Sequence, residues 1–183
     1  MSRVVAGTLG GRRLRVPTGR STRPTAERVR EGLVSTVESI RGPLDDAAFL
    51  DLYAGSGAVG IEAASRGAAH VTCVERDVRA LAVLRANVEA VGATVVEVSS
   101  APVERVLGDK PVRPYDVVYV DPPYADPVDE VLALLDKNGW LAPAAVVVVE
   151  RATRASPPEW PPGLVLDRSR RYGDTTLWYG RRP

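Results

Sequence analysis

From residue 47 onward, the chain alternates between short apolar runs and longer segments that carry apolar residues at helical spacing. Apolar runs of this length indicate buried β-strands, whereas apolar positions three and four residues apart indicate amphipathic helices. The expected strands cover 48–52, 70–75, 95–99, 116–120 and 145–150, and the expected helices lie near 58–66, 77–91, 101–108 and 127–136. This alternation predicts an α/β fold, with a parallel sheet covered by helices on both faces.

The segment before this alternation has a different pattern. Two β-type runs at 3–7 and 13–17, joined by Gly10-Gly11, predict a small hairpin. Apolar residues at helical spacing then predict a helix over 27–40, with Thr25 as its cap. We expect this part to be an N-terminal extension of the main fold.

The C-terminal segment also departs from the alternation. Residues 163–170 and 175–179 flank a turn at 172–174, which predicts an antiparallel hairpin at one edge of the sheet. This hairpin brings the expected sheet to seven strands. The sequence thus divides into an extension over 1–42 and a main domain over 43–183.

Composition narrows the chemistry that is available. The chain has 183 residues, of which 45% are hydrophobic, enough for one substantial core. It contains one cysteine (Cys73) and one histidine (His70), which exclude a disulfide framework and a Cys/His zinc site, and we expect no nucleophile built on a Cys–His or Ser–His pair. No apolar run approaches the roughly 20 residues of a membrane span, and Met1 to Gly11 lacks the apolar run of a signal peptide. We therefore expect a cytoplasmic protein without metal or membrane attachment.

The net charge of +1 conceals an uneven distribution along the chain. Residues 1–30 carry eight arginines against one acid, Glu27, for a net charge of +7, and the other 153 residues carry 16 basic and 22 acidic side chains, for −6. Such asymmetry indicates a nucleic acid or another polyanion as partner. Arg28 and Arg30 are expected to lie off the apolar stripe of their helix and to be free to reach that partner.

A glycine-rich turn follows the first strand of the main domain. Gly55, Gly57 and Gly60 satisfy the G-x-G-x-x-G spacing, and Glu75 follows Gly55 by 20 residues at the end of the next strand. Together these are the fingerprint of a nucleotide-binding turn whose acid bonds a ribose hydroxyl. The turn alone does not distinguish a nicotinamide cofactor from S-adenosylmethionine.

Two features favour S-adenosylmethionine. Asp51 precedes the glycines at the end of the strand, where a carboxylate suits a cationic amino group and would repel a pyrophosphate. The chain also lacks room for the further substrate domain of a nicotinamide enzyme. Glu75 would then bind the ribose diol, Asp77 would cap the next helix, and Ser100 would lie at the adenine edge or cap the helix near Pro102. The candidate cofactor-binding residues are Asp51, Tyr53, Ala54, Gly55, Ser56, Gly57, Glu75, Arg76, Ser100 and Ala101.

The fourth strand is followed by Asp121-Pro122-Pro123-Tyr124. This tetrapeptide resembles the signature of the methyltransferases that act on exocyclic amino groups of nucleobases. The resemblance implies that the Asp121 carboxylate and the Pro122 carbonyl accept hydrogen bonds from the amine. It also implies that Tyr124 stacks on the base, which must be flipped out or single-stranded.

Further motifs resemble the RsmD family, whose members methylate N2 of a guanine in 16S ribosomal RNA. They are Arg3-Val4-Val5-Ala6-Gly7, Gly11-Arg12-Arg13-Leu14, Arg23-Pro24-Thr25, Arg28-Val29-Arg30-Glu31 and Arg171-Tyr172-Gly173-Asp174-Thr175. The resemblance implies a Rossmann-like class I methyltransferase fold, S-adenosylmethionine as cofactor, and the small ribosomal subunit as partner of a monomeric enzyme. The residues expected to face RNA are Arg12, Arg13, Arg23, Thr25, Arg28 and Arg30.

Three other functions remain as alternatives. An amino-group methyltransferase acting on adenine N6 or cytosine N4, in another RNA or in DNA, would share the tetrapeptide, but a DNA enzyme would also need a target-recognition segment. A dehydrogenase would share only the glycine turn. A non-catalytic RNA-binding protein would need only the basic extension.

Overall fold

The computed structural model describes residues 2–17, 27–123 and 128–183. The helices in these ranges are α1 (Glu27–Arg41), α2 (Ala58–Ser65), α3 (Val78–Val91), α4 (Val103–Gly108) and α5 (Val128–Lys137). The strands are β1 (Ser2–Arg3), β2 (Arg13–Leu14), β3 (Ala48–Leu52), β4 (His70–Val74), β5 (Val96–Ser99), β6 (Tyr115–Val120), β7 (Leu141–Ala152), β8 (Val165–Tyr172) and β9 (Thr175–Arg181).

Seven strands form the main sheet, in the order β5-β4-β3-β6-β7-β9-β8. The first five are parallel to one another, whereas β9 pairs antiparallel with both β7 and β8. The chain runs outward from β3 through β4 to β5 and then returns to the other side of β3 as β6. This return confirms the expected α/β sheet and creates a topological switch point between β3 and β6, where open parallel sheets bind ligands.

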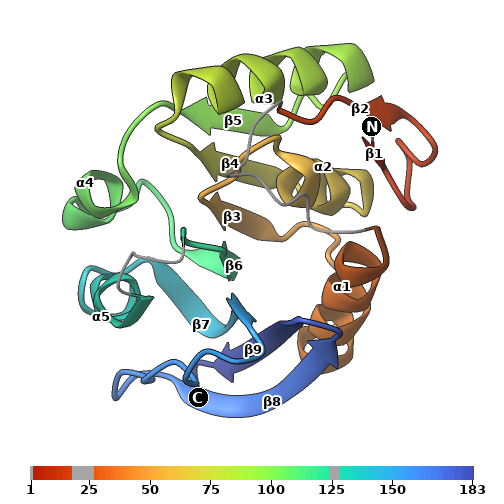
Figure 1. Cartoon of the computed structure of the whole chain (residues 1–183). Coiled ribbons are helices and arrows are strands. Elements are labelled where there is room, and N and C mark those ends of the chain that lie inside the picture. The colour runs from red at the N-terminus through yellow and green to blue at the C-terminus, as the bar shows by residue number, and fades with distance from the viewer. Residues whose placement is uncertain (1, 18–26, 124–127) are drawn as a thin grey trace.

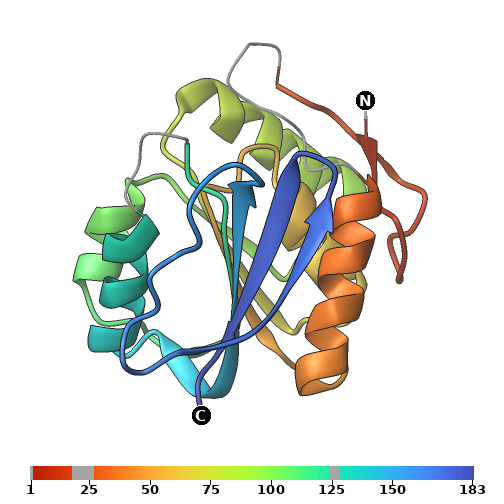
Figure 2. The ribbon, with the colours of Figure 1, turned by 60° about the horizontal axis from the view of Figure 1, so that its bottom comes forward.

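Helices cover both faces of the sheet (Figures 1 and 2). One buried cluster joins α1, α2 and α3 to one face through residues such as Leu33, Ile61 and Leu84. A second cluster joins α4 and α5 to the other face through Leu107 and Leu132. The central strands read as continuous apolar runs because both of their faces are buried.

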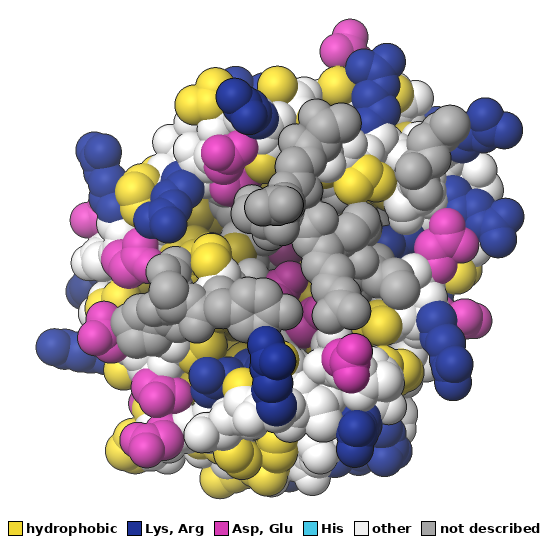
Figure 3. Space-filling model, viewed as in Figure 1, with side chains coloured by type: hydrophobic (Ala, Val, Ile, Leu, Met, Phe, Trp, Pro, Cys, Tyr) yellow, Lys and Arg dark blue, Asp and Glu magenta, His cyan; other side chains and the backbone are white. Residues whose placement is uncertain are grey.

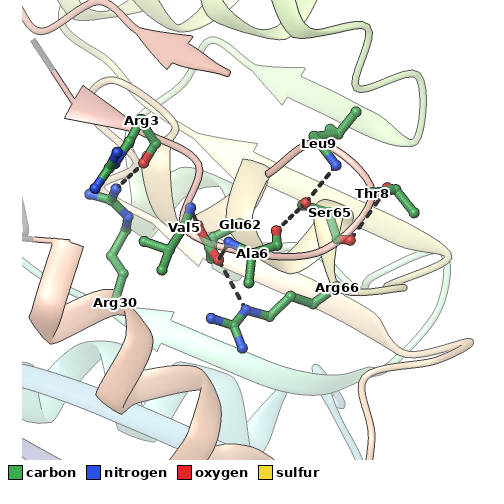
Figure 4. Close-up of polar contacts among 9 residues, drawn as sticks. All are labelled: Arg3, Val5, Ala6, Thr8, Leu9, Arg30, Glu62, Ser65 and Arg66. Carbon is green, nitrogen blue, oxygen red and sulfur yellow. Dashed lines mark hydrogen bonds and ion pairs between the residues drawn. The ribbon is translucent and has the colours of Figure 1, made fainter. Parts of the chain in front are cut away.

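The N-terminal hairpin is shorter than the sequence predicts. β1 and β2 pair antiparallel at two positions, and the Val4 amide still donates to the Arg12 carbonyl at 2.9 Å. The amides of Val5 and Ala6 donate instead to the Glu62 carboxylate on α2, at 2.7 and 3.1 Å, so the hairpin does not extend to residue 7. Glu62 is fully buried and also accepts from Arg66 Nε at 3.0 Å. Figure 4 shows these contacts, which attach the segment after β1 to α2.

The N-terminal segment shares the main core. Val4 and Leu14 are each 1% exposed and belong to the cluster that also holds α1, α2 and α3. Gly7 has a φ of +82°, and a Cβ built on it would overlap the Ser65 carbonyl oxygen. This position therefore needs glycine both for its backbone conformation and for the close approach to α2.

The bounds of one central strand also differ from the prediction. β7 begins at Leu141, four residues earlier than expected, and is interrupted by a register shift where Ala144 has a φ of 60°. Leu141 and Ala142 are buried, but Pro143 and Ala144 are exposed. A proline inside an apolar run argues against a central strand, which is why the sequence predicts the strand only from residue 145. No helix of the described ranges is long and apolar enough to cross a membrane.

Candidate active site

A cavity of about 900 Å³ opens at the carboxyl ends of β3, β4, β6 and β7, over the switch point of the sheet. Figure 3 shows acidic side chains at the bottom of a hollow near the centre of the face seen in Figure 1. The predicted site residues that line the cavity are Asp51, Tyr53, Ala54, Gly55, Ser56, Glu75, Arg76, Ala101, Asp121, Pro122 and Pro123. Residues from distant parts of the sequence therefore meet in one cavity.

The glycine turn forms a tight connection between β3 and α2. Gly57, the N-cap of α2, has a φ of +78°. This left-handed conformation is one that glycine adopts without the strain that a side chain would cause. A Cβ on Gly60 would lie 2.5 Å from Cys73 Sγ and 3.3 Å from Asp51 Oδ2. The third glycine of the motif thus allows α2 to pack directly on β3 and β4.

Asp51 is the most buried acid of the cavity, with 1% of its surface exposed. Its Oδ2 accepts a hydrogen bond from the Gly60 amide at 2.9 Å, whereas its Oδ1 has no partner among the described residues. Burial, opposed by the Gly60 amide and assisted by the charge of Glu75, raises the pKa of Asp51 to about 7. A buried carboxylate oxygen without a partner fits the cationic amino group of S-adenosylmethionine.

Glu75 organises the turn in addition to lining the cavity. Its Oε2 accepts from the Gly55 amide at 2.8 Å, and its Oε1 accepts from the amides of Arg76 and Asp77, each at 2.8 Å. Carboxylate oxygens have about four lone-pair sites, so these bonds leave capacity for a ribose hydroxyl. Asp77 caps α3 as expected, because its side chain accepts from the Ala80 amide at 2.8 Å.

The segment that follows β5 contributes fewer residues to the cavity than the sequence predicts. Ala101 lines the cavity, but Ser100 is not among the lining residues. The alternative role of Ser100 as a helix cap is wrong, because Pro102 is the N-cap of α4. Gly57 supports the turn and also lies outside the lining.

Asp121 follows β6 directly and is partly buried in the cavity. Burial first, and then the charges of Glu150 and Asp51, raise its pKa well above the usual range of a carboxyl group. Pro122 and Pro123 continue along the same wall. Tyr124, the last residue of the predicted catalytic tetrapeptide, lies outside the described residues.

Two residues of this wall were missed by the sequence analysis. Glu150, near the end of β7, lines the cavity, and Tyr119 donates a hydrogen bond from its hydroxyl to Glu150 Oε2. The apolar runs around both residues indicated only buried strands. Glu150 lies near the carboxyl end of an otherwise apolar run, as Asp51 and Glu75 do. This shared position was the signal that would have identified it.

The basic extension is only partly exposed. Arg12, Arg13 and Arg28 are exposed, and Arg12 Nη1 also donates to the Val91 carbonyl at the end of α3. Val16 and Pro17, which follow β2, line the cavity. The extension therefore leads from an exposed basic surface to the rim of the site.

Arg30 corrects the prediction for the extension. It is 1% exposed, and its Nη2 donates to Ser2 Oγ at 3.0 Å and to the Arg3 carbonyl at 2.6 Å. The prediction that Arg30 is free to reach a partner is wrong. Its side of α1 is covered by β1, while the apolar side of α1 packs on the core. Arg23 and Thr25 lie outside the described residues.

Comparisons with known proteins agree with this arrangement. Residues 2–181 match the model of a family described as "Conserved hypothetical protein 95". The chain is 36% identical, over 92% of its length and 83% of the relative, to "Ribosomal RNA small subunit methyltransferase D" of Escherichia coli (strain K12). It is 34% identical, over 94% of its length and 95% of the relative, to "Putative rRNA methyltransferase YlbH" of Bacillus subtilis (strain 168).

Among solved structures, "Putative methyltransferase yhhF from Escherichia coli" superposes with a TM-score of 0.87 at 34% identity, covering 99% of this chain and 97% of the other. This likeness extends over the N-terminal segment, the sheet and the C-terminal hairpin together. The family match, the identity to curated relatives and the shared fold lead to one conclusion: the chain belongs to the RsmD family of ribosomal RNA small-subunit methyltransferases.

Proposed function

We propose that this protein transfers a methyl group from S-adenosylmethionine to the exocyclic N2 amine of a guanine in 16S ribosomal RNA. The observation that carries the proposal is that Asp121 and Pro122 line the same cavity as the glycine turn and the unpartnered oxygen of Asp51. The cavity thus joins a site for a cationic cofactor to a pair of hydrogen-bond acceptors for an amine. The small ribosomal subunit is the proposed partner, and a cytoplasmic monomer the proposed state.

The cofactor half of the site is assembled by β3, β4 and the segment after β5. Asp51 would hold the amino group, the amides of the glycine turn would face the rest of the amino acid part, and Glu75 would bind the ribose diol. Ala101 would lie against the adenine. When bound, S-adenosylmethionine supplies a methyl group activated by its sulfonium charge.

Asp121 and Pro122 orient the substrate. The lone pair of an exocyclic amine is delocalised into the base, so the amine is a weak nucleophile until its hydrogens are held. The Asp121 carboxylate and the Pro122 carbonyl accept one hydrogen bond each from the amine, which directs the lone pair at the methyl carbon. Correct positioning of this kind contributes roughly 7–11 kcal/mol to lowering a barrier.

The Asp121 carboxylate also serves as the acceptor of the proton that the amine releases. As the carbon–nitrogen bond forms and the carbon–sulfur bond breaks, the nitrogen becomes acidic and releases one proton. Burial and two neighbouring acids raise the pKa of Asp121, so this group accepts that proton more readily than an exposed aspartate does. Tyr124 is proposed to stack on the base.

The proposed RNA contacts lie in the extension over 1–42. Its exposed arginines Arg12, Arg13 and Arg28, with Arg23 and Thr25, would bind phosphates, while Val16 and Pro17 connect this surface to the cavity. Phosphate contacts of this kind position a protein on RNA without reading its sequence. Arg30 is not included, because its guanidinium holds the N-terminal segment.

The experiment that tests the function is nucleoside mass mapping of small-subunit RNA from cells with and without the protein. We expect one N2-methylguanosine that disappears with the gene and returns with the wild-type protein. Asp121→Ala should fail to restore it, yet should still gain thermal stability from S-adenosylhomocysteine, because that variant retains Asp51 and the glycine turn. Loss of an N6-methyladenosine or N4-methylcytosine instead would overturn the base assignment.

A further inference from the structure

Glu150 is a second acid beside Asp121 that the proposed reaction does not use. β6 and β7 are parallel and pair Val120 with Val149, so Asp121 and Glu150 occupy the next positions along neighbouring strands. Both side chains line the cavity. The charge of Glu150 is one cause of the raised pKa of Asp121, as expected for acids at adjacent positions of neighbouring strands.

The hydroxyl of Tyr119 fixes the orientation of this acid. It donates to Glu150 Oε2, and Tyr119 is itself 2% exposed within the sheet. A carboxylate has about four lone-pair sites, so one hydrogen bond from Tyr119 leaves acceptor positions on Glu150 for a ligand. Glu150 therefore presents an acceptor to the cavity.

The strand order places Glu150 on the substrate side of Asp121. The glycine turn, Glu75 and Ala101 follow β3, β4 and β5, which lie on one side of β6 in the order β5-β4-β3-β6-β7. Glu150 lies on β7, on the opposite side of β6. A base whose amine is held at Asp121 must extend over β6 and β7, because the cofactor takes the other half of the cavity.

We propose that Glu150 forms a base-recognition subsite that accepts a hydrogen bond from the ring N1–H adjacent to the reacting amine of guanine. This inference rests on the proposed function and adds the origin of its base selectivity. In guanine the amine on C2 is next to N1–H, a donor. In adenine and cytosine the ring nitrogen next to the amine is an acceptor, which the Glu150 carboxylate would repel. Asp121 and Glu150 together therefore select two adjacent donors.

The test replaces the mapped target guanosine by 2-aminopurine, using ligated 16S ribosomal RNA assembled into small subunits. 2-Aminopurine retains the amine on C2 but has an acceptor at N1. We expect the wild-type protein to methylate it with a kcat/KM at least about a hundredfold lower than for guanosine, because sites built for a hydrogen bond strongly reject analogues that lack it.

Three variants separate recognition from stability. Glu150→Gln places an amide donor in the subsite, so it should lose activity on guanosine and exceed the wild type on 2-aminopurine. Tyr119→Phe releases the carboxylate and should reduce the preference for guanosine in the same direction by a smaller factor. Glu159→Gln, the same change at an exposed glutamate outside the cavity lining, should leave both rates unchanged.

Two outcomes would overturn the subsite. One is a wild-type protein that methylates both bases at similar rates, and the other is a Glu150→Gln variant that loses activity on both bases by the same factor. Binding of the two RNAs, measured in parallel, should show the same reversal of preference. If the wild-type protein methylates neither base, the proposed function fails, which is a result distinct from failure of the subsite.

Discussion

Raising the pH from 6 to 7.5 is expected to tighten the binding of S-adenosylhomocysteine, because only the ionised form of Asp51 attracts its amino group. Asp51 lies on β3 with 1% of its surface exposed, and burial is the main cause that raises its pKa to about 7. The protein without cofactor therefore holds this carboxyl group largely protonated at pH 6. Binding at that pH requires the carboxyl group to lose its proton first.

The size of the effect follows from the fraction of protein that is ionised. When only the ionised form binds, the apparent Kd is the intrinsic Kd divided by that fraction. With a pKa of about 7, the fraction is roughly one in eleven at pH 6 and about three in four at pH 7.5. The apparent Kd should therefore fall about eightfold between these two values of pH.

Isothermal titration calorimetry at several values of pH measures this change directly. Asp51→Asn keeps an oxygen for the Gly60 amide but cannot ionise, so its affinity should be weaker at pH 7.5 and independent of pH. 5′-Methylthioadenosine lacks the amino acid part and should bind the wild-type protein with little change between the two values. A pH dependence that persists in Asp51→Asn would refute the role given to this carboxylate.

The same shift makes an independent prediction for the stability of the protein without cofactor. The pKa of Asp51 is higher in the folded than in the unfolded state, so the unfolded state loses its proton first as the pH rises. The free energy of unfolding should fall between about pH 4 and 7, by about 4 kcal/mol for a shift of roughly three units. Denaturant unfolding should show a loss in Asp51→Asn that is smaller than the wild-type loss by this amount, because the raised pKa of Asp121 still contributes in both proteins.

Two further predictions concern the N-terminal extension. Gly7→Ala should lower the free energy of unfolding by at least about 3 kcal/mol in denaturant titrations, because the added Cβ would overlap the Ser65 carbonyl and detach the extension from α2. Gly11→Ala is the control: Gly11 has a similar φ of +81° but open space around it, so this variant should lose only about 1 kcal/mol. Equal losses in the two variants would show that the contact with Ser65 is unimportant. Arg28→Glu should weaken binding to small-subunit RNA and reduce its salt dependence, whereas Lys137→Glu, the same charge change at the exposed end of α5, should not. An unchanged salt slope in Arg28→Glu would remove this arginine from the RNA surface.

The sequence predicted the central part of the fold well because its signals there are local. The strand Ala48–Leu52 has the predicted bounds, and the helix bounds of α2 and α3 agree to within one residue. Buried parallel strands require apolar runs and the intervening helices require a 3.6-residue period, so each element is encoded in its own residues. The glycine turn and the helix cap at Asp77 are local in the same sense.

Two of the errors occurred where a residue's partner comes from a distant segment. Arg30 has the sequence context of an exposed helical residue and is buried because β1 crosses it. The Glu62 carboxylate on α2 accepts hydrogen bonds from the amides of Val5 and Ala6, and these contacts limit the length of the N-terminal hairpin. These contacts span 27 to 57 residues of sequence, and no local pattern contains them.

The sequence by itself determined the class of fold, the glycine turn and the Asp-Pro-Pro-Tyr motif proposed to be catalytic, because each depends on residues that are close together in the chain. Only the tertiary structure decided that Glu150 stands beside Asp121, since strands separated by a helix become neighbours only when the sheet forms. It also raised the pKa of Asp51 and of Asp121, because both shifts arise from burial and from acids on or next to other strands. Chemistry that depends on the electrostatic environment is fixed only when the chain has folded.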